Sequence, residues 1–224
     1  MSGARDQVLG RIGAVLGDAP PSRAEARARL KTPRAGPVPS RALVNDKARV
    51  DLFLEEARRV EATAARVGSP SEAAAAVARY LAENGLPGEL RVAPHPDLKK
   101  IPWSEQPHLT VRDGPAEGGD PVGVATAFAG IAETGTLVLL SGRETPTTLN
   151  FLPDTHIVVL PTARVYGTYE DVWAALRAQG RGFMPRTVNW ITGPSRTADI
   201  EQKLLLGAHG PQRLHIVIVD EQTT

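Results

Sequence analysis

A carboxylate followed by a glycine turn marks residues 124–142, which read VATAFAGIAETGTLVLLSG. The carboxyl group of Glu133 can act as a base, a nucleophile or a hydrogen-bond acceptor. Gly135 lets the backbone approach a ligand closely, and the hydroxyls of Thr134 and Thr136 can bind one. The same residues are also typical of a tight turn between a helix and a strand, with Glu133 capping or solvated. Both interpretations stay open at this point.

A second candidate site follows the predicted strand 188–191, in the segment ITGPSRTADIE. Its Gly-Pro pair predicts a turn, after which a helix is expected to begin. Backbone amides at a helix start, together with hydroxyls and a guanidinium, suit a phosphate or carboxylate. The alternative is capping of that helix by a hydroxyl, with acidic side chains complementing its dipole. The two readings are compatible, and the candidate binding residues are Ser195, Arg196, Thr197 and Asp199.

Two further polar residues belong to the candidate set. His209 lies in the glycine-flanked segment GAHGP before the last predicted strand, where it is either a catalyst or a hydrogen-bonding spacer. Asn150 follows another strand end and is expected to line the same cleft, because ligands of open α/β sheets bind beyond the carboxyl ends of strands. The 5 histidines show no paired ligand spacing, so no metal site is predicted.

The elements predicted to position these residues are helices before Glu89, whereas strands alternate with turns and helices after it. Helical periodicity covers residues 2–16 and 40–67, and a capped helix is predicted from Ser69 to a left-handed stop at Gly85. Later helices are predicted over residues 169–179 and 199–206. The predicted strands are residues 90–92, 109–111, 122–124, 136–140, 157–160, 188–191 and 214–219. Continuous aliphatic runs among them are typical of strands buried on both faces, which predicts an α/β fold with a mostly parallel sheet flanked by helices.

The composition limits the class of protein. A chain of 224 residues is long enough for one α/β domain over residues 40–224, with a helical or flexible extension over residues 1–39. The absence of cysteine excludes disulfides, thiolate zinc sites, cysteine nucleophiles and iron–sulfur clusters held by the chain's own thiolates. It also fits a reducing cytoplasm, and the lack of a long apolar run or secretory leader predicts a soluble protein without membrane contact.

The charge balance bears on nucleic-acid binding. Lys and Arg number 26 against 25 Asp and Glu, which provides no overall attraction to nucleic acid. Four arginines between residues 23 and 34 resemble a nucleic-acid arm, but a partly mobile linker or an exposed helix is the favoured interpretation. Because this segment is short and mixed with prolines, no nucleic-acid partner is predicted.

Four segments together carry a family resemblance: GIAETGTLVLLSG, HIVVLPTARV, VNWITGPSRTADIE and LLLGAHGPQRLHIVIVD. They resemble the LUD-domain family and, within it, the lactate-utilization protein C group. The resemblance implies a fold similar to the ribose-phosphate isomerase, glucosamine-phosphate deaminase and coenzyme A transferase superfamily. It also implies a role in oxidising L-lactate to pyruvate beside two partner proteins that carry iron–sulfur clusters, with no cofactor held by this chain. In the related coenzyme A transferases a glutamate before a glycine turn is the nucleophile, and Glu133 is similar in type.

Two functions are compatible with these observations. The first is an accessory or catalytic subunit of a lactate-oxidising complex, which binds a small carboxylate or a partner surface. The second is a stand-alone enzyme for a sugar-phosphate or acyl-coenzyme A substrate. In that enzyme Glu133 is the base or nucleophile, and Ser195 and Arg196 clamp the anion.

Overall fold

The computed structural model describes residues 3–16, 22–31, 35–180, 182–197, 205–206 and 209–220 of the chain. The chain divides into two compact units, Met1–Pro37 and Val38–Thr224. The first unit contains the helices α1 (Ala4–Leu16) and α2 (Arg23–Lys31). Helix α1 agrees with the helix predicted over residues 2–16, and its Val8 and Ile12 side chains are exposed.

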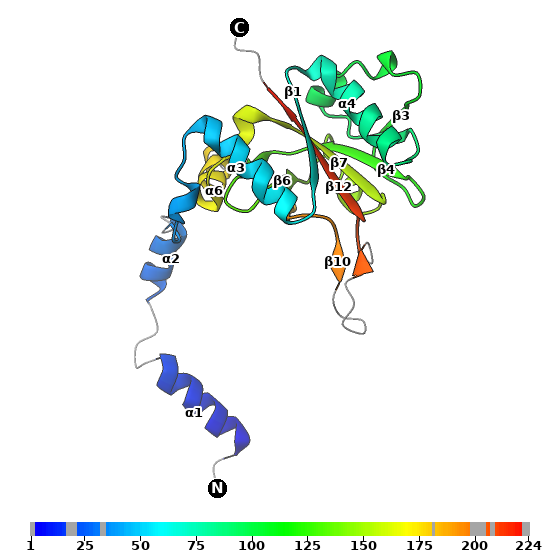
Figure 1. Cartoon of the computed structure of the whole chain (residues 1–224). Coiled ribbons are helices and arrows are strands. Elements are labelled where there is room, and N and C mark those ends of the chain that lie inside the picture. The colour runs from blue at the N-terminus through cyan, green and yellow to red at the C-terminus, as the bar shows by residue number, and fades with distance from the viewer. Residues whose placement is uncertain are drawn as a thin grey trace. The chain divides into compact units, whose positions relative to one another are not determined.

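The second unit is built on a six-stranded sheet with the strand order β1-β12-β7-β4-β2-β3 (Figure 1). All neighbouring strands in it run parallel. The strands are β1 (Thr63–Val67), β2 (Glu89–Val92), β3 (Thr110–Asp113), β4 (Val122–Thr126), β7 (Thr155–Pro161) and β12 (Arg213–Val219). The predicted fold class, a mostly parallel sheet flanked by helices, is confirmed.

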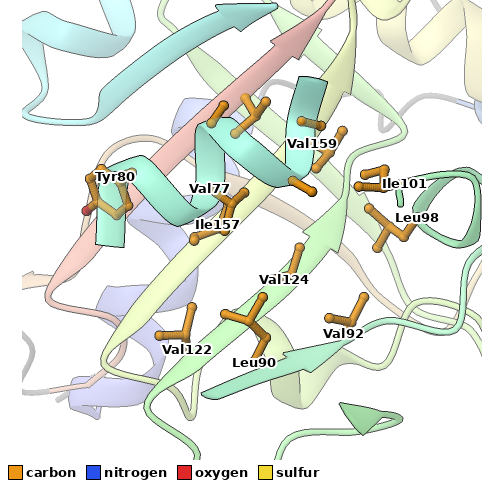
Figure 2. Close-up of a cluster of buried hydrophobic side chains, with 14 of the residues drawn as sticks. Val77, Tyr80, Leu90, Val92, Leu98, Ile101, Val122, Val124, Ile157 and Val159 are labelled. Carbon is orange, nitrogen blue, oxygen red and sulfur yellow. The ribbon is translucent and has the colours of Figure 1, made fainter. Parts of the chain in front are cut away.

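Each face of the parallel sheet has its own aliphatic core. Ile157 and Val159 of β7 belong to a core that includes α4 (Pro70–Glu83), whereas Val158 and Leu160 belong to a core that includes α3 (Asp46–Arg59). Figure 2 shows the first core, in which Val77 of α4 lies over the strands. Because both faces of the sheet are covered, successive residues of these strands are buried on opposite faces and most are apolar. This explains the continuous aliphatic sequence of the strands.

A smaller sheet has the strand order β8-β5-β6-β9, and β6 runs antiparallel to both of its neighbours. Its strands are β5 (Ala129–Ile131), β6 (Thr136–Leu140), β8 (Val165–Tyr166) and β9 (Val188–Ile191). One face packs against α6 (Tyr169–Ala178), which matches the predicted helix 169–179. The strands predicted over residues 136–140 and 188–191 do not belong to the parallel sheet, contrary to expectation. They form β6 and β9 of the smaller sheet, because a turn at residues 132–135 folds β6 back on β5.

The helix predicted over residues 40–67 is also partly wrong. Helix α3 ends at Arg59, Glu61 adopts a left-handed φ of 67°, and the chain then enters β1. Helix α4 begins after Ser69 and stops before Gly85, which has a φ of 61°, as predicted. The Ser69 hydroxyl makes no capping bond, and the Glu72 carboxylate instead accepts a hydrogen bond from the Gly68 amide at 3.1 Å.

Short elements connect the strands: α5 (Pro96–Lys99), and the 3-10 turns η1 (Ser40–Ala42), η2 (Trp103–Glu105), η3 (Thr147–Asn150) and η4 (Thr162–Arg164). Within the described ranges, no helix combines the length and apolar character needed to cross a membrane. The same ranges contain no group of three or more His, Cys, Asp or Glu side chains arranged to hold a metal ion.

Candidate functional site

The turn at Glu133 packs against the end of α3. The Glu133 amide donates a hydrogen bond to the Gly167 carbonyl at 3.0 Å, and its carbonyl accepts one from Arg41 at 3.4 Å. Gly135 has a φ of 65°, and a Cβ there would lie 2.2 Å from the backbone nitrogen of Ala57. The close approach of α3 therefore requires a glycine at this position. This packing explains the glycine without a bound ligand.

Four hydroxyl groups form a hydrogen-bonded cluster beside this turn. The buried Thr136 Oγ1 lies 2.7 Å from Thr134 Oγ1, 3.0 Å from Tyr169 Oη and 2.6 Å from Thr192 Oγ1. Tyr169 Oη is also 3.0 Å from Thr134 Oγ1. These groups satisfy one another, so the two predicted threonines join β6, α6 and the end of β9.

Arg196 is likewise held at the end of α3. Its guanidinium donates a hydrogen bond to the Val60 carbonyl at 2.9 Å and pairs with the Glu61 carboxylate at 3.1 Å. Neither Arg196 nor Glu133 lines the cavities described below.

The segment around Arg196 is a strand in place of the predicted helix start. Strand β10 (Arg196–Thr197) pairs antiparallel with β11 (Leu205–Leu206), so the helix predicted over residues 199–206 is wrong at residues 205–206. The backbone of Ser195 is also engaged, because its amide donates to the Pro211 carbonyl at 2.8 Å. No helix amino terminus therefore presents amides at residues 195–197. Asp199 lies outside the described residues.

Three of the predicted residues meet in one cavity, which we call the amino-edge pocket because it lies at the amino ends of β7 and β12. Asn150 comes from η3, Ser195 from the loop after β9, and His209 from the loop before β12. The cavity has a volume of about 220 Å³. It is lined by Asn150, Phe151, His156, Trp190, Ile191, Gly193, Pro194, Ser195, His209, Gly210, Pro211 and Leu214.

The same pocket contains His156, which sequence reasoning missed. Its side chain is 1% exposed, and its Nε2 atom has no hydrogen-bond partner in the described part of the chain. Burial lowers the pKa of His156 to about 4, so the ring is neutral near pH 7. A neutral imidazole offers one donor and one acceptor. The available signal was a histidine at the start of an otherwise aliphatic strand.

A larger cavity, which we call the carboxyl-edge pocket, lies at the opposite edge of the parallel sheet. It has a volume of about 770 Å³ and lies beyond the carboxyl ends of β2, β4 and β7. Its lining comprises His95, Thr126, Ala127, Phe128, Leu140, Ser141, Gly142, Arg143, Glu144, Thr145, Arg164, Tyr166, Gln179, Phe183 and Pro185. None of these was predicted as a site residue, because their convergence depends on the strand order.

The charges beside the carboxyl-edge pocket are partly paired. Arg164 contacts the Asp97 carboxylate at 2.6 Å and donates a hydrogen bond to the Ala127 carbonyl at 3.3 Å. Burial opposes ionisation of Asp97, but the hydrogen bond and the charge of Arg164 lower its pKa below the ordinary value. Burial also lowers the pKa of His95, with Asp97 acting in the opposite direction. The fixed guanidinium of Arg164 therefore faces the cavity beside an ionised Asp97 and a neutral His95.

Comparison with known proteins finds a family match for the segment that contains the amino-edge pocket. Residues 121–219 match the family model of the LUD domain. The match covers less than half of the chain, and this segment is similar to the LUD domain. The family resemblance predicted from the four sequence segments is thereby confirmed. All residues that line the amino-edge pocket lie inside the matched segment, whereas His95 of the carboxyl-edge pocket precedes it.

Curated relatives match slightly less than half of the chain. The chain is 37% identical over 103 residues to lactate utilization protein C of Geobacillus kaustophilus, covering 45% of this chain and 43% of that protein. It is 40% identical over 97 residues to an uncharacterized protein of Neisseria meningitidis, covering 43% of this chain and 41% of that protein. The aligned region thus spans less than half the length of these relatives.

A solved structure supports the fold. A crystal structure of a DUF162 family protein from Deinococcus radiodurans superposes with a TM-score of 0.59 at 22% identity. The alignment covers 79% of this chain and 99% of that protein. At this identity the likeness concerns the fold alone.

Proposed function

We propose that this chain is a lactate-utilization protein whose amino-edge pocket binds a small carboxylate such as lactate or pyruvate. The observation that carries the proposal is the meeting of Asn150, Ser195 and His209 with the buried, unpartnered Nε2 of His156 in one cavity of the segment that matches the LUD domain. The name of the Geobacillus kaustophilus relative supports the assignment to lactate.

The chemistry of the amino-edge pocket suits a small hydroxy acid or keto acid. Asn150, Ser195 and the neutral imidazole of His156 supply hydrogen-bond donors for carboxylate and hydroxyl or keto oxygens. Trp190 and Leu214 offer apolar surface for a methyl group. A volume of about 220 Å³ lies below the range of about 300–1,000 Å³ typical of drug-sized ligands, so a ligand of few atoms is favoured.

We further propose that oxidation of lactate requires iron–sulfur partner proteins. Conversion of lactate to pyruvate removes two electrons and two protons, and the electrons need an acceptor. The chain contains no cysteine, so it cannot ligate an iron–sulfur cluster through its own thiolates. On this proposal the chain binds the carboxylate as an accessory or catalytic subunit, and the partners carry the electrons away.

Calorimetric titration of the full chain with L-lactate and with pyruvate tests the binding proposal. His156→Gln should weaken the affinity at least tenfold, because the substitution changes the buried imidazole that faces the ligand. His108→Gln is the matched control, since His108 is exposed and lies outside both pockets. Circular dichroism establishes that each variant is folded. Absence of lactate and pyruvate binding by the unsubstituted chain, or equal affinities in both variants, would refute the proposal.

A genetic test addresses the lactate role separately. Deletion of the gene should abolish growth on L-lactate and leave growth on pyruvate intact, because the proposed function lies before pyruvate. Growth on lactate that is unaffected by the deletion would contradict a role in lactate utilization, whatever the chain binds.

A further inference from the structure

We propose that the carboxyl-edge pocket is a second ligand site, and that it takes a nucleotide. This goes beyond the proposed function, which uses only the amino-edge pocket. The carboxyl-edge pocket has a volume of about 770 Å³, more than three times the roughly 220 Å³ of the amino-edge pocket. A six-atom carboxylate would leave most of it to water, whereas its volume lies within the range typical of larger organic ligands.

The position of the carboxyl-edge pocket in the sheet supports a ligand site. Strands β2 and β4 are neighbours, but the chain continues from β2 to β3 on one side, and from β4 through β5 and β6 of the smaller sheet to β7 on the other. His95 follows β2, and Ala127 follows β4, so both line the crevice where these connections diverge. Open α/β sheets bind ligands, including nucleotides, in such crevices beyond the carboxyl ends of their strands.

Two guanidinium groups line the pocket and suit phosphate. Arg164 is oriented by Asp97 at 2.6 Å and by the Ala127 carbonyl at 3.3 Å, while its side chain stays 34% exposed. Arg143 is exposed and makes no ion pair with the described residues. A guanidinium binds phosphate oxygens through two parallel hydrogen bonds, which gives both strength and orientation.

The remaining lining matches the other parts of a nucleotide. Glu144 offers a carboxylate acceptor beside the arginines, the chemistry that holds ribose hydroxyls in dinucleotide-binding folds. Phe128 and Phe183 contribute rings whose centroids lie 6.5 Å apart at 41°. Phe183 is 38% exposed, so its ring presents open surface on which a flat base can stack. Phosphate, sugar and base thus each meet a side chain of suitable chemistry.

Titration of the full chain with ADP, adenosine and inorganic phosphate tests the proposal. ADP should bind at least tenfold more tightly than either adenosine or phosphate, because only ADP uses both the arginines and the aromatic side chains. Phosphate as tight as ADP would reduce the pocket to a simple anion site, and adenosine as tight as ADP would remove the role of the arginines. Either result, or no binding of ADP, would overturn the proposal.

Variants locate the binding. Arg143→Gln should weaken ADP at least tenfold, and Phe183→Ala should weaken ADP and adenosine but leave phosphate unchanged. Arg58→Gln is the matched control, since Arg58 is an exposed arginine of α3 outside the carboxyl-edge pocket. Equal loss of ADP affinity in Arg143→Gln and Arg58→Gln would refute the location. Lactate affinity should stay unchanged in all three variants, so failure of this proposal is distinguishable from failure of the amino-edge proposal.

Discussion

Gly135 lies directly against Ala57 at the end of α3, where a Cβ on Gly135 would come 2.2 Å from the Ala57 amide nitrogen. Gly193 makes a similar close approach to Val60, the residue directly after α3, since a Cβ on Gly193 would lie 2.3 Å from the Val60 carbonyl oxygen. Both glycine turns of the candidate segments therefore pack against the end of α3. Their glycines reflect this packing, and the cavity that gathers the polar residues lies beside it.

Gly135→Ala should destabilise the chain strongly. The alanine must adopt a φ near 65° and must also displace the backbone of α3, which together cost about 3 kcal/mol or more. Gly85→Ala is the control, because Gly85 has a φ of 61° and its Cβ would meet nothing within 4 Å. Its cost should be about 1 kcal/mol. Urea denaturation measures both, and equal losses would contradict the close contact with α3.

The hydroxyl cluster supports a second prediction. Thr136→Val keeps the side-chain shape but removes the oxygen that contacts Thr134, Tyr169 and Thr192. The loss should be about 1–3 kcal/mol in the free energy of unfolding, because Thr136 is fully buried and its partners lose hydrogen bonds. Thr134→Val, at a half-buried residue with fewer contacts, should cost less. Unchanged stability of Thr136→Val would argue against a structural role of the cluster.

Strands that are buried on both faces of the sheet could be predicted well from the sequence. The aliphatic run 157–160 predicts β7 correctly, since both faces of that strand need apolar side chains. Residues 63–67 were harder, because Ala64 and Val67 fit helical spacing as well as strand spacing. The left-handed φ of Glu61 that separates α3 from β1 has no clear sequence signal.

The candidate site could be predicted only in part. Local segments predict Asn150, Ser195 and His209 as site residues, and the structure brings the three together in the amino-edge pocket. Local segments do not reveal the strand order, which decides that His95 and Arg164 share the carboxyl-edge pocket. Assignment of residues 136–140 to the smaller sheet, in which β6 pairs antiparallel with β5 and β9, depends on the same long-range pairing.

Glu133→Gln separates the two functions considered for this chain. Glu133 does not line the amino-edge pocket, so lactate affinity should change less than twofold. Stability should also change by less than about 0.5 kcal/mol, because the side chain is half-buried and its backbone makes the described contacts. Calorimetry and urea denaturation measure these quantities. A folded Glu133→Gln variant that loses turnover on a sugar-phosphate or acyl-coenzyme A substrate would instead favour the stand-alone enzyme.

His156 should make the native state sensitive to acid. Its pKa is lowered by burial from 6.5 to about 4, so between these values the unfolded chain binds a proton that the native chain does not. Stability is therefore unaffected well above pH 6.5 and falls as the pH drops below it. The expected contribution of His156 is a loss of about 2 kcal/mol at pH 5 and about 3 kcal/mol near pH 4.

Urea denaturation at pH 7 and pH 5 measures this contribution by difference. His156→Gln removes the titrating group, so the decrease between the two pH values should be smaller than in the unsubstituted chain by about 2 kcal/mol. His108→Gln should show the full decrease, because His108 is exposed. His215, whose pKa burial likewise lowers to about 4, accounts for a further part of the decrease that remains in His156→Gln. If His156→Gln lost as much stability as the unsubstituted chain, the imidazole would not be buried and neutral, and its role as a donor in the amino-edge pocket would fail with it.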